Sequence, residues 1–213
     1  MTVLKSVKIG ERRVSAVFVA DGAVEKYRMT APLWEKFSLS EGDEVDDATF
    51  SEVRRASAMS EAVTAAGRIV EVSPQSEIGL ARKLARRGFD REIAKYAAAA
   101  LSKAGVLNEK RDAEAYADAA ARRKKWGPAR ITAELMAKGY PAAVAKAAPL
   151  SVPEEEYRAA LRERIKSRCP SGQVTEKERA TLFSSLSRYG FSGGEIRREA
   201  ETMLTVIYDD ENE

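Results

Sequence analysis

The sequence has no histidine and only one cysteine, Cys169, among its 213 residues. The absence of histidine removes Ser-His-Asp and Cys-His catalytic sites, histidine-bound metals and the usual general base near pH 7. A single cysteine excludes an internal disulfide and a cysteine-rich zinc site. We therefore expect a protein of a reducing compartment that is not an enzyme and uses no metal or other cofactor.

Long apolar runs and nucleotide-binding loops are lacking as well. No stretch approaches the ~18 uncharged apolar residues of a membrane span. The first eight residues have no apolar core of the kind found in a signal peptide. No Gly-x-x-x-x-Gly-Lys-Ser/Thr loop occurs, which argues against ATP binding of the Walker type. With 44% apolar and 32% charged residues, the sequence predicts a folded cytoplasmic protein without membrane contact.

Charge is distributed unevenly along the chain. The total of 36 basic and 33 acidic residues gives a net charge of +3. Residues 1–70 carry a net −1 and residues 71–206 a net +8, whereas residues 207–213 hold four acids. Residues 82–130 alone contain 14 basic and 6 acidic side chains. Such a segment meets phosphates or an acidic protein surface, or it is simply a solvated helix face rich in Lys and Arg.

The first 70 residues read as a small sheet followed by helices. β-branched and aromatic residues alternate over residues 3–9, 14–20 and 24–29, with turns at residues 10–12 and at Asp21-Gly22. This pattern predicts three antiparallel strands. Thr30 is expected to cap a short helix with Pro32 in its first turn, and apolar spacing predicts a longer helix from Asp46 or Asp47 to Val72.

An internal repeat organises the rest of the chain. Residues 80–89, 131–140 and 182–191 align without gaps, so that an aliphatic pair, a glycine and an aromatic recur every 51 residues. The aliphatic pair forms a stripe on a helix, and the glycine supplies the left-handed conformation that ends it. The motif residues are Leu84, Gly88 and Phe89, then Leu135, Gly139 and Tyr140, then Leu186, Gly190 and Phe191.

After each motif, a second helix is expected over residues 91–103, 142–148 and 194–205. A third helix fits residues 108–125 after the first pair and residues 153–168 after the second, and the latter also precedes the last motif. The fold class is therefore mainly α, with tandem three-helix repeats in an elongated, curved array behind the small N-terminal three-stranded antiparallel β segment. We expect an accessory β segment at 1–46, helical units at 47–107, 108–152 and 153–206, and an acidic tail at 207–213.

The same residues carry a family resemblance. The run Trp126-Gly127-Pro128-Ala129-Arg130-Ile131-Thr132-Ala133-Glu134-Leu135 resembles the central signature of RecX regulatory proteins. The similarity to that family extends to three further segments, which are Ser76-Glu77 with Arg82-Lys83-Leu84 and Arg87-Gly88-Phe89, residues 104–116, and Gly190-Phe191 with Ile196. The resemblance covers about residues 50–205. Asp112 departs from it, because the family usually has an aromatic residue there.

The resemblance implies a regulator of the RecA recombinase. RecX-like proteins bind the groove of the RecA filament on single-stranded DNA and inhibit its ATPase, strand exchange and coprotease activities. They thereby regulate DNA repair, homologous recombination and the SOS response, and some also bind DNA directly. We accordingly expect a monomer whose partner is the RecA filament, with possible weak contact to nucleic acid. A DNA-binding transcription regulator of the helix-turn-helix type is the alternative that the helix-Gly-helix repeats leave open.

Exposed basic side chains around the motifs are the candidate partner-binding or nucleic-acid-binding residues. Arginine grips phosphate or carboxylate with two parallel hydrogen bonds, and Trp126 or Tyr189 offers a face for stacking. For Trp126 the other interpretation is packing between the first and second helical units. Neither Cys169 nor Glu154-Glu155-Glu156 is expected to form a site. The candidates are Arg82, Lys83, Arg86 and Arg87; Arg122, Arg123, Lys124, Lys125, Trp126 and Arg130; and Arg188, Tyr189, Arg197 and Arg198.

Overall fold

The computed structural model describes residues 1–207 and divides the chain into two compact units. The N-terminal unit comprises residues 1–107, and the C-terminal unit begins at Asn108. Each unit has hydrophobic clusters of its own. Apart from Ile207, the predicted acidic tail at 207–213 lies outside the described residues.

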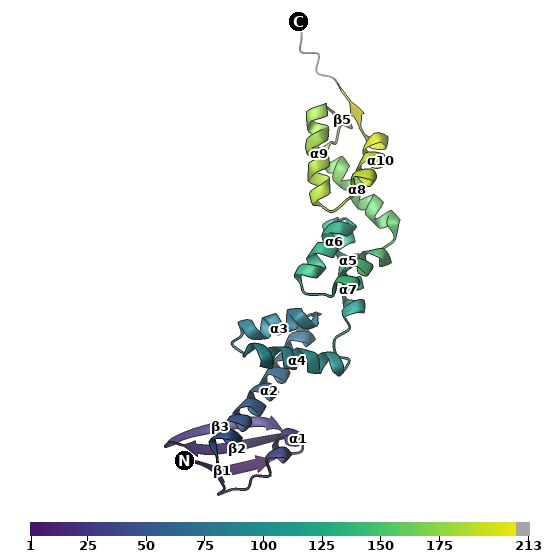
Figure 1. Cartoon of the computed structure of the whole chain (residues 1–213). Coiled ribbons are helices and arrows are strands. Elements are labelled where there is room, and N and C mark those ends of the chain that lie inside the picture. Colours follow the sequence, from purple (N-terminus) through teal and green to yellow (C-terminus); the bar gives the residue numbers. More distant parts are fainter. Residues whose placement is uncertain (208–213) are drawn as a thin grey trace. The chain divides into compact units, whose positions relative to one another are not determined.

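A small antiparallel sheet opens the N-terminal unit (Figure 1). Strands β1 (Thr2–Ile9), β2 (Arg13–Ala20) and β3 (Ala23–Thr30) confirm the three predicted strands. A fourth strand, β4 (Glu44–Val45), was not predicted and gives the sheet the order β3-β2-β1-β4. The backbone N–H of Leu4 donates to the carbonyl of Asp43 at 3.0 Å, and its carbonyl accepts from Gly42 at 2.8 Å. These bonds hold the residues just before β4 against β1. A strand of only two residues leaves no periodic signal in the sequence.

One face of this sheet builds the first core. Alternate residues of β2, including Val14, Ala16 and Phe18, are buried together with Trp34 of α1 (Ala31–Trp34). A 3₁₀ turn, η1 (Glu35–Phe37), follows that helix. Thr30 occupies the position before α1, but its side chain makes no capping hydrogen bond. The predicted cap is therefore wrong in that respect, and α1 begins with a proline in its first turn instead.

Helix α2 (Asp47–Val72) serves two cores along its length. Its first half buries Phe50 and Val53 against the sheet, and its second half buries Ala66 and Ile69 against α3 (Glu77–Arg86) and α4 (Arg91–Lys103). Midway, the Ser57 hydroxyl accepts from the backbone N–H of Arg28 and donates to its carbonyl, both at 3.0 Å. The helix thus satisfies backbone groups at the open edge of β3 as well as covering the face of the sheet.

The C-terminal unit contains two further three-helix groups. The first is α5 (Glu109–Lys124), α6 (Pro128–Ala137) and α7 (Ala142–Ala147) with the 3₁₀ turn η2 (Ala148–Ser151), and the second is α8 (Glu154–Arg168), α9 (Glu176–Arg188) and α10 (Gly193–Met203). Two short parallel strands, β5 (Gln173–Val174) and β6 (Thr205–Val206), were missed. Helix α10 was expected to reach Thr205, but it ends at Met203 because Thr205 pairs with Gln173 instead.

The repeated motif forms the same backbone turn three times. Gly88, Gly139 and Gly190 have φ angles of +94°, +88° and +92°. After each glycine the aromatic N–H donates to the carbonyl five residues earlier, at 3.3 Å from Phe89, 3.0 Å from Tyr140 and 3.4 Å from Phe191. Together with the glycine N–H bond three residues back, this is a Schellman turn. The predicted helix stops are confirmed.

Most of the α-helices in the described part of the chain begin with a side-chain cap. Ser76 and Asn108 accept backbone N–H groups at the starts of α3 and α5, and Thr175 forms a capping box with Glu178. Ser192 forms a second capping box with Glu195 that the sequence interpretation missed. Gly193 and Gly194 both lie inside the capped first turn of α10.

The elongated, curved arrangement that the sequence predicts for the three-helix groups remains a prediction. The mainly helical fold behind an antiparallel sheet is confirmed. Over residues 1–207, no helix combines the length and apolar character that crossing a membrane requires.

Substitution of Gly190 by alanine is predicted to destabilise the C-terminal unit more than its φ angle alone requires. A Cβ at this position would lie 2.4 Å from the backbone nitrogen of Arg130 and 2.6 Å from its Cβ. The left-handed backbone costs about 1 kcal/mol and the overlap about 1–3 kcal/mol more. Urea unfolding followed by the fluorescence of Trp126 measures the loss.

Gly194→Ala is the matched control, because Gly194 lies four residues away, in the first turn of α10, with open space around its Cα. We expect this variant to keep or raise stability, by up to about 1 kcal/mol. Equal small effects of Gly190→Ala and Gly194→Ala would contradict the close contact at Gly190.

Candidate functional site

Two backbone segments of the C-terminal unit approach each other at Gly127 and Gly190. The N–H of Gly127 donates to the carbonyl of Tyr189 at 2.8 Å, and the N–H of Ala129 donates to the carbonyl of Gly190 at 3.2 Å. A Cβ at Gly127 would lie 2.4 Å from the Gly190 oxygen. The start of α6 and the end of α9 can therefore meet in this way only with glycine at both positions.

Alternating aromatic and cationic side chains surround this contact. The ammonium of Lys124 lies 4.3 Å from the ring centre of Trp126, and the guanidinium of Arg130 lies 4.4 Å from the same centre. Arg130 is also 5.5 Å from the ring centre of Tyr189, which Arg164 approaches to 3.3 Å. These five residues, from α5, α6, α8 and the turns beside them, are called the junction cluster below.

Two arginines of the junction cluster also satisfy the carboxyl ends of helices. Arg164 donates to the carbonyls of Lys125 at 2.7 Å and Lys124 at 2.5 Å, where α5 ends. Arg130 donates to the carbonyl of Arg188 at 3.3 Å, at the end of α9. A positive charge at a helix C-terminus interacts favourably with the helix dipole. The two arginines thereby link α8 to α5 and α6 to α9.

The junction cluster keeps its positive charge. No carboxylate among residues 1–207 forms a recorded ion pair with Lys124, Arg130 or Arg164. The effect is visible at Tyr189, whose pKa is lowered mainly by electrostatic attraction to Arg164 and further by a hydrogen bond from it. The cluster accordingly presents a net positive charge.

The structure brings together only some of the predicted residues. Lys124, Trp126, Arg130 and Tyr189 meet in the junction cluster, and the carbonyl of Arg188 accepts from one of its members. Arg164 was missed, because it stands in a run of mixed charge within α8 that does not single it out. Trp126 is half-buried and packs against the core of the C-terminal unit with one face near cations.

Two of the other predicted cations, Arg122 and Lys125, form ion pairs with nearby carboxylates. Arg122 pairs with Asp118 at 2.7 Å and with Glu156 at 2.6 Å, and Lys125 pairs with Glu163 at 2.7 Å. Arg123 is exposed. Arg197 and Arg198 are exposed on α10, and the remaining candidates lie on or just after α3 of the N-terminal unit: Arg82, Lys83, Arg86 and Arg87.

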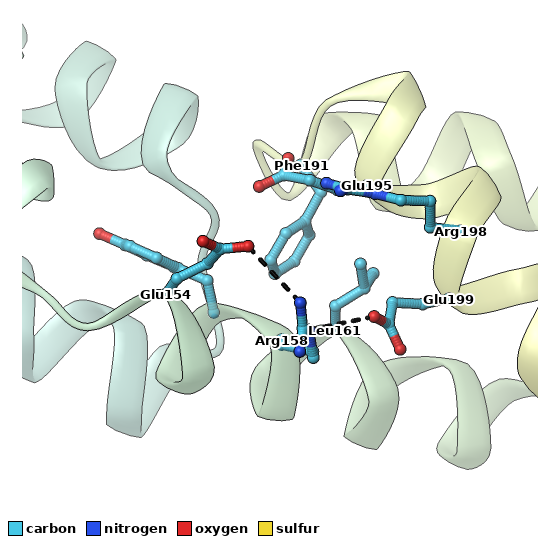
Figure 2. A pocket seen from close by; sticks show the side chains of 8 residues that line it. Glu154, Arg158, Leu161, Phe191, Glu195, Arg198 and Glu199 are labelled. Carbon is cyan, nitrogen blue, oxygen red and sulfur yellow. Dashed lines mark ion pairs between the residues drawn. The ribbon is translucent and has the colours of Figure 1, made fainter.

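A pocket between α8 and α10 is too small for an organic ligand. Its volume is about 20 Å³, which is room for one water molecule. Figure 2 shows Arg158 between the carboxylates of Glu154 and Glu199, with ion-pair distances of 3.6 and 3.3 Å. Glu199 is 9% exposed and also pairs with Arg162 at 2.5 Å. The pocket is therefore an ion-pair network that fastens α10 to α8.

Metal and thiol chemistry find no support in the described part of the chain. Residues 1–207 contain no group of three or more Cys, Asp or Glu placed to hold a metal ion. The acidic start of α8 instead pairs with arginines, as Glu155 does with Arg158 at 3.1 Å. Burial raises the pKa of the Cys169 thiol, which keeps it in the less reactive protonated form.

Arg164→Gln is predicted to destabilise the C-terminal unit by about 1–3 kcal/mol, because two charge-assisted hydrogen bonds and the contact with Tyr189 are lost. The pKa of Tyr189 is predicted to rise towards its ordinary value. A group with a lowered pKa stabilises the folded state when ionised. The stability difference between wild type and variant therefore widens as the pH rises through the pKa of Tyr189.

Ultraviolet titration of the tyrosines measures this shift, and Tyr189→Phe identifies which transition belongs to Tyr189. Lys166→Gln is the matched control, because Lys166 is exposed on the same helix and has no recorded partner. We expect that variant to stay within about 0.5 kcal/mol of wild type. The same tyrosine titration in wild type and Arg164→Gln would contradict the assigned contact.

Comparison with known proteins finds similarity to RecX in one segment of the sequence and in the fold. Residues 108–148, which span α5 to α7, match the family model described as "RecX, second three-helix domain". The crystal structure of a regulatory protein RecX is similar with a TM-score of 0.74 at 15% sequence identity, covering 94% of this chain and 100% of its own. The crystal structure of RecX from Lactobacillus salivarius gives a TM-score of 0.61 at 18% identity, covering 68% of this chain and 96% of its own.

The sequence matches none of the curated proteins with which it was compared. The two structural likenesses, at low sequence identity, show the fold, and the family model adds a match in sequence that includes Trp126, Gly127 and Arg130 of the contact described above. The resemblance to RecX proteins found in the sequence is thereby confirmed, by sequence over residues 108–148 and by fold over most of the chain.

Proposed function

We propose that this protein regulates RecA by binding the groove of the RecA filament on single-stranded DNA, and that it inhibits ATP hydrolysis, strand exchange and coprotease activity there. The similarity of residues 108–148 and of the fold to RecX, a regulatory protein, supports a regulatory role with a protein partner. The observation that carries the proposal is the junction cluster. It gathers three cations without carboxylate partners at a contact that joins two consecutive three-helix groups.

The junction cluster supports ionic contacts rather than base stacking. The rings of Trp126 and Tyr189 already have cations over their faces, from Lys124, Arg130 and Arg164. The guanidinium groups of Arg130 and Arg164 each use some donors on backbone carbonyls, and an arginine has five donors in all. The remaining donors suit carboxylates on the recombinase or phosphates of its DNA.

A repeated structure suits a repeated partner. Each three-helix group needs to make only a modest contact, because linked contacts gain from effective concentration. A protein bound to several recombinase subunits at once would restrain the movements between subunits on which ATP hydrolysis and strand exchange depend. Inhibition would then need fewer copies of this protein than of RecA.

Charge reversal near the junction cluster is predicted to relieve inhibition. Arg123, Lys124 and Arg188 are exposed and form no ion pair with any of residues 1–207, so Arg123→Glu, Lys124→Glu and Arg188→Glu together should leave the fold intact. We expect this triple variant to weaken inhibition of the ATPase activity of RecA on single-stranded DNA by tenfold or more in half-maximal concentration, about 1.4 kcal/mol. Circular dichroism checks the helix content.

The matched control carries the same charge change at Lys110, Lys146 and Lys166, which are exposed elsewhere on the C-terminal unit. Inhibition by the control should stay close to that of wild type. Inhibition unchanged in the first triple variant would remove the junction cluster from the proposal. A wild-type protein that leaves the ATPase untouched but binds duplex DNA with sequence preference would favour the alternative, a helix-turn-helix transcription regulator.

A further inference from the structure

A second basic surface runs along α2 in the N-terminal unit. Two hollows lie on this helix, one of about 240 Å³ beside the sheet and one of about 380 Å³ beside α3. Arg68 lines both hollows, and the two neighbouring hollows together are called the α2 groove below. Its cations come from β2, β3, α2, α3 and the residue that follows α3: Arg13, Arg28, Arg68, Lys83, Arg86 and Arg87.

These six cations are all exposed, and none has a recorded ion pair in the described part of the chain. Glu61 is the single acid among the lining residues. By contrast, Arg122, Arg158 and Arg162 of the C-terminal unit each pair with carboxylates. Unpaired like charges gathered at one surface repel each other and raise the affinity for an anionic partner.

Helix electrostatics accounts for only part of this arrangement. Arg86 and Arg87 lie at the carboxyl end of α3, where positive charge is favoured by the helix dipole. Arg13 and Arg28 lie on strands, and Arg68 lies one turn before the end of α2. A local structural role thus explains the arginines of α3 but not their convergence with those of the sheet and of α2.

The apolar residues that line the α2 groove distinguish between two kinds of anionic partner. Val72 is 86% exposed and lines the larger hollow together with Ile69, amid Arg68, Lys83 and the end of α3. No aromatic residue lines either hollow, so nucleic-acid bases would find no ring on which to stack. Phosphate groups gain no binding energy from the exposed side chain of Val72. An acidic peptide with an apolar side chain can contact both the cations and this valine.

We propose that the α2 groove is the docking surface for an acidic segment of a protein partner, which places an apolar side chain against Val72 and its carboxylates against Arg68, Lys83 and Arg86. This inference rests on the proposed function in taking that partner to be a subunit of the RecA filament. It assigns the groove to protein rather than to the DNA of the filament.

The test compares two probes, the RecA filament assembled on single-stranded DNA and the same DNA without RecA. Fluorescence anisotropy of the labelled full-length chain measures binding to each. Arg68→Glu is expected to weaken filament binding by about tenfold and Val72→Ser by about threefold to tenfold. For Val72→Ser, the affinity for bare DNA should change by less than twofold. For Arg68→Glu, the loss of affinity for bare DNA should be much smaller than the loss of affinity for the filament.

Arg55→Glu is the matched control, because Arg55 is exposed on the same helix, carries the same charge and lines neither hollow. Its affinity for the filament should stay within about twofold of wild type. All three substitutions are at exposed positions, and the fluorescence of buried Trp34 reports whether the N-terminal unit stays folded.

Each outcome separates the inference from the proposed function. Wild-type protein that fails to bind the filament contradicts the proposed function. Wild-type binding with no loss in Arg68→Glu and Val72→Ser overturns the α2 groove while the proposed function stands. Equal losses on filament and bare DNA in Arg68→Glu, with none in Val72→Ser, assign the groove to nucleic acid and overturn the proposal.

Discussion

The contact between Gly127 and Gly190 is the constraint on which the C-terminal unit depends. Two backbone hydrogen bonds form there only because neither residue has a side chain. This approach brings the first turn of α6 to the end of α9, so that Arg130 reaches a carbonyl of α9 and the ring of Tyr189. Arg164 completes the arrangement by joining α8 to the end of α5. The glycine that stops a helix at position 190 is thus also the residue that allows two three-helix groups to meet.

The repeats share a turn but not its surroundings. Gly88, Gly139 and Gly190 have nearly equal φ angles and the same pattern of hydrogen bonds. A Cβ at Gly88 would meet open space, whereas one at Gly190 would meet the backbone of Arg130. Phe89 is half-buried, while Tyr140 and Phe191 are 8% and 4% exposed. A sequence repeat therefore reports a common local conformation, and the different neighbours give each copy its own role.

Local rules made most of the fold predictable and left the assembled sites hidden. Alternation in β2, the apolar spacing of α2 and the helix stops at the repeated glycines are signals that lie within a few residues of each other. The strand β4 and the pair β5 and β6 are two residues long each, and distant backbone groups hold them. The candidate site was predictable through Trp126 and Tyr189, but the place of Arg164 beside Tyr189 and of Arg13 and Arg28 beside Arg68 depends on contacts between distant segments.

The continuity of α2 has a consequence for how the chain can be divided. One uninterrupted helix completes both the β-sheet core, through Phe50 and Val53, and the helical core, through Ala66 and Ile69. Removal of residues 1–46 would expose Phe50 and Val53 and leave an apolar surface on an otherwise intact helix. A chain shortened in this way would be prone to self-association unless those two positions were made polar.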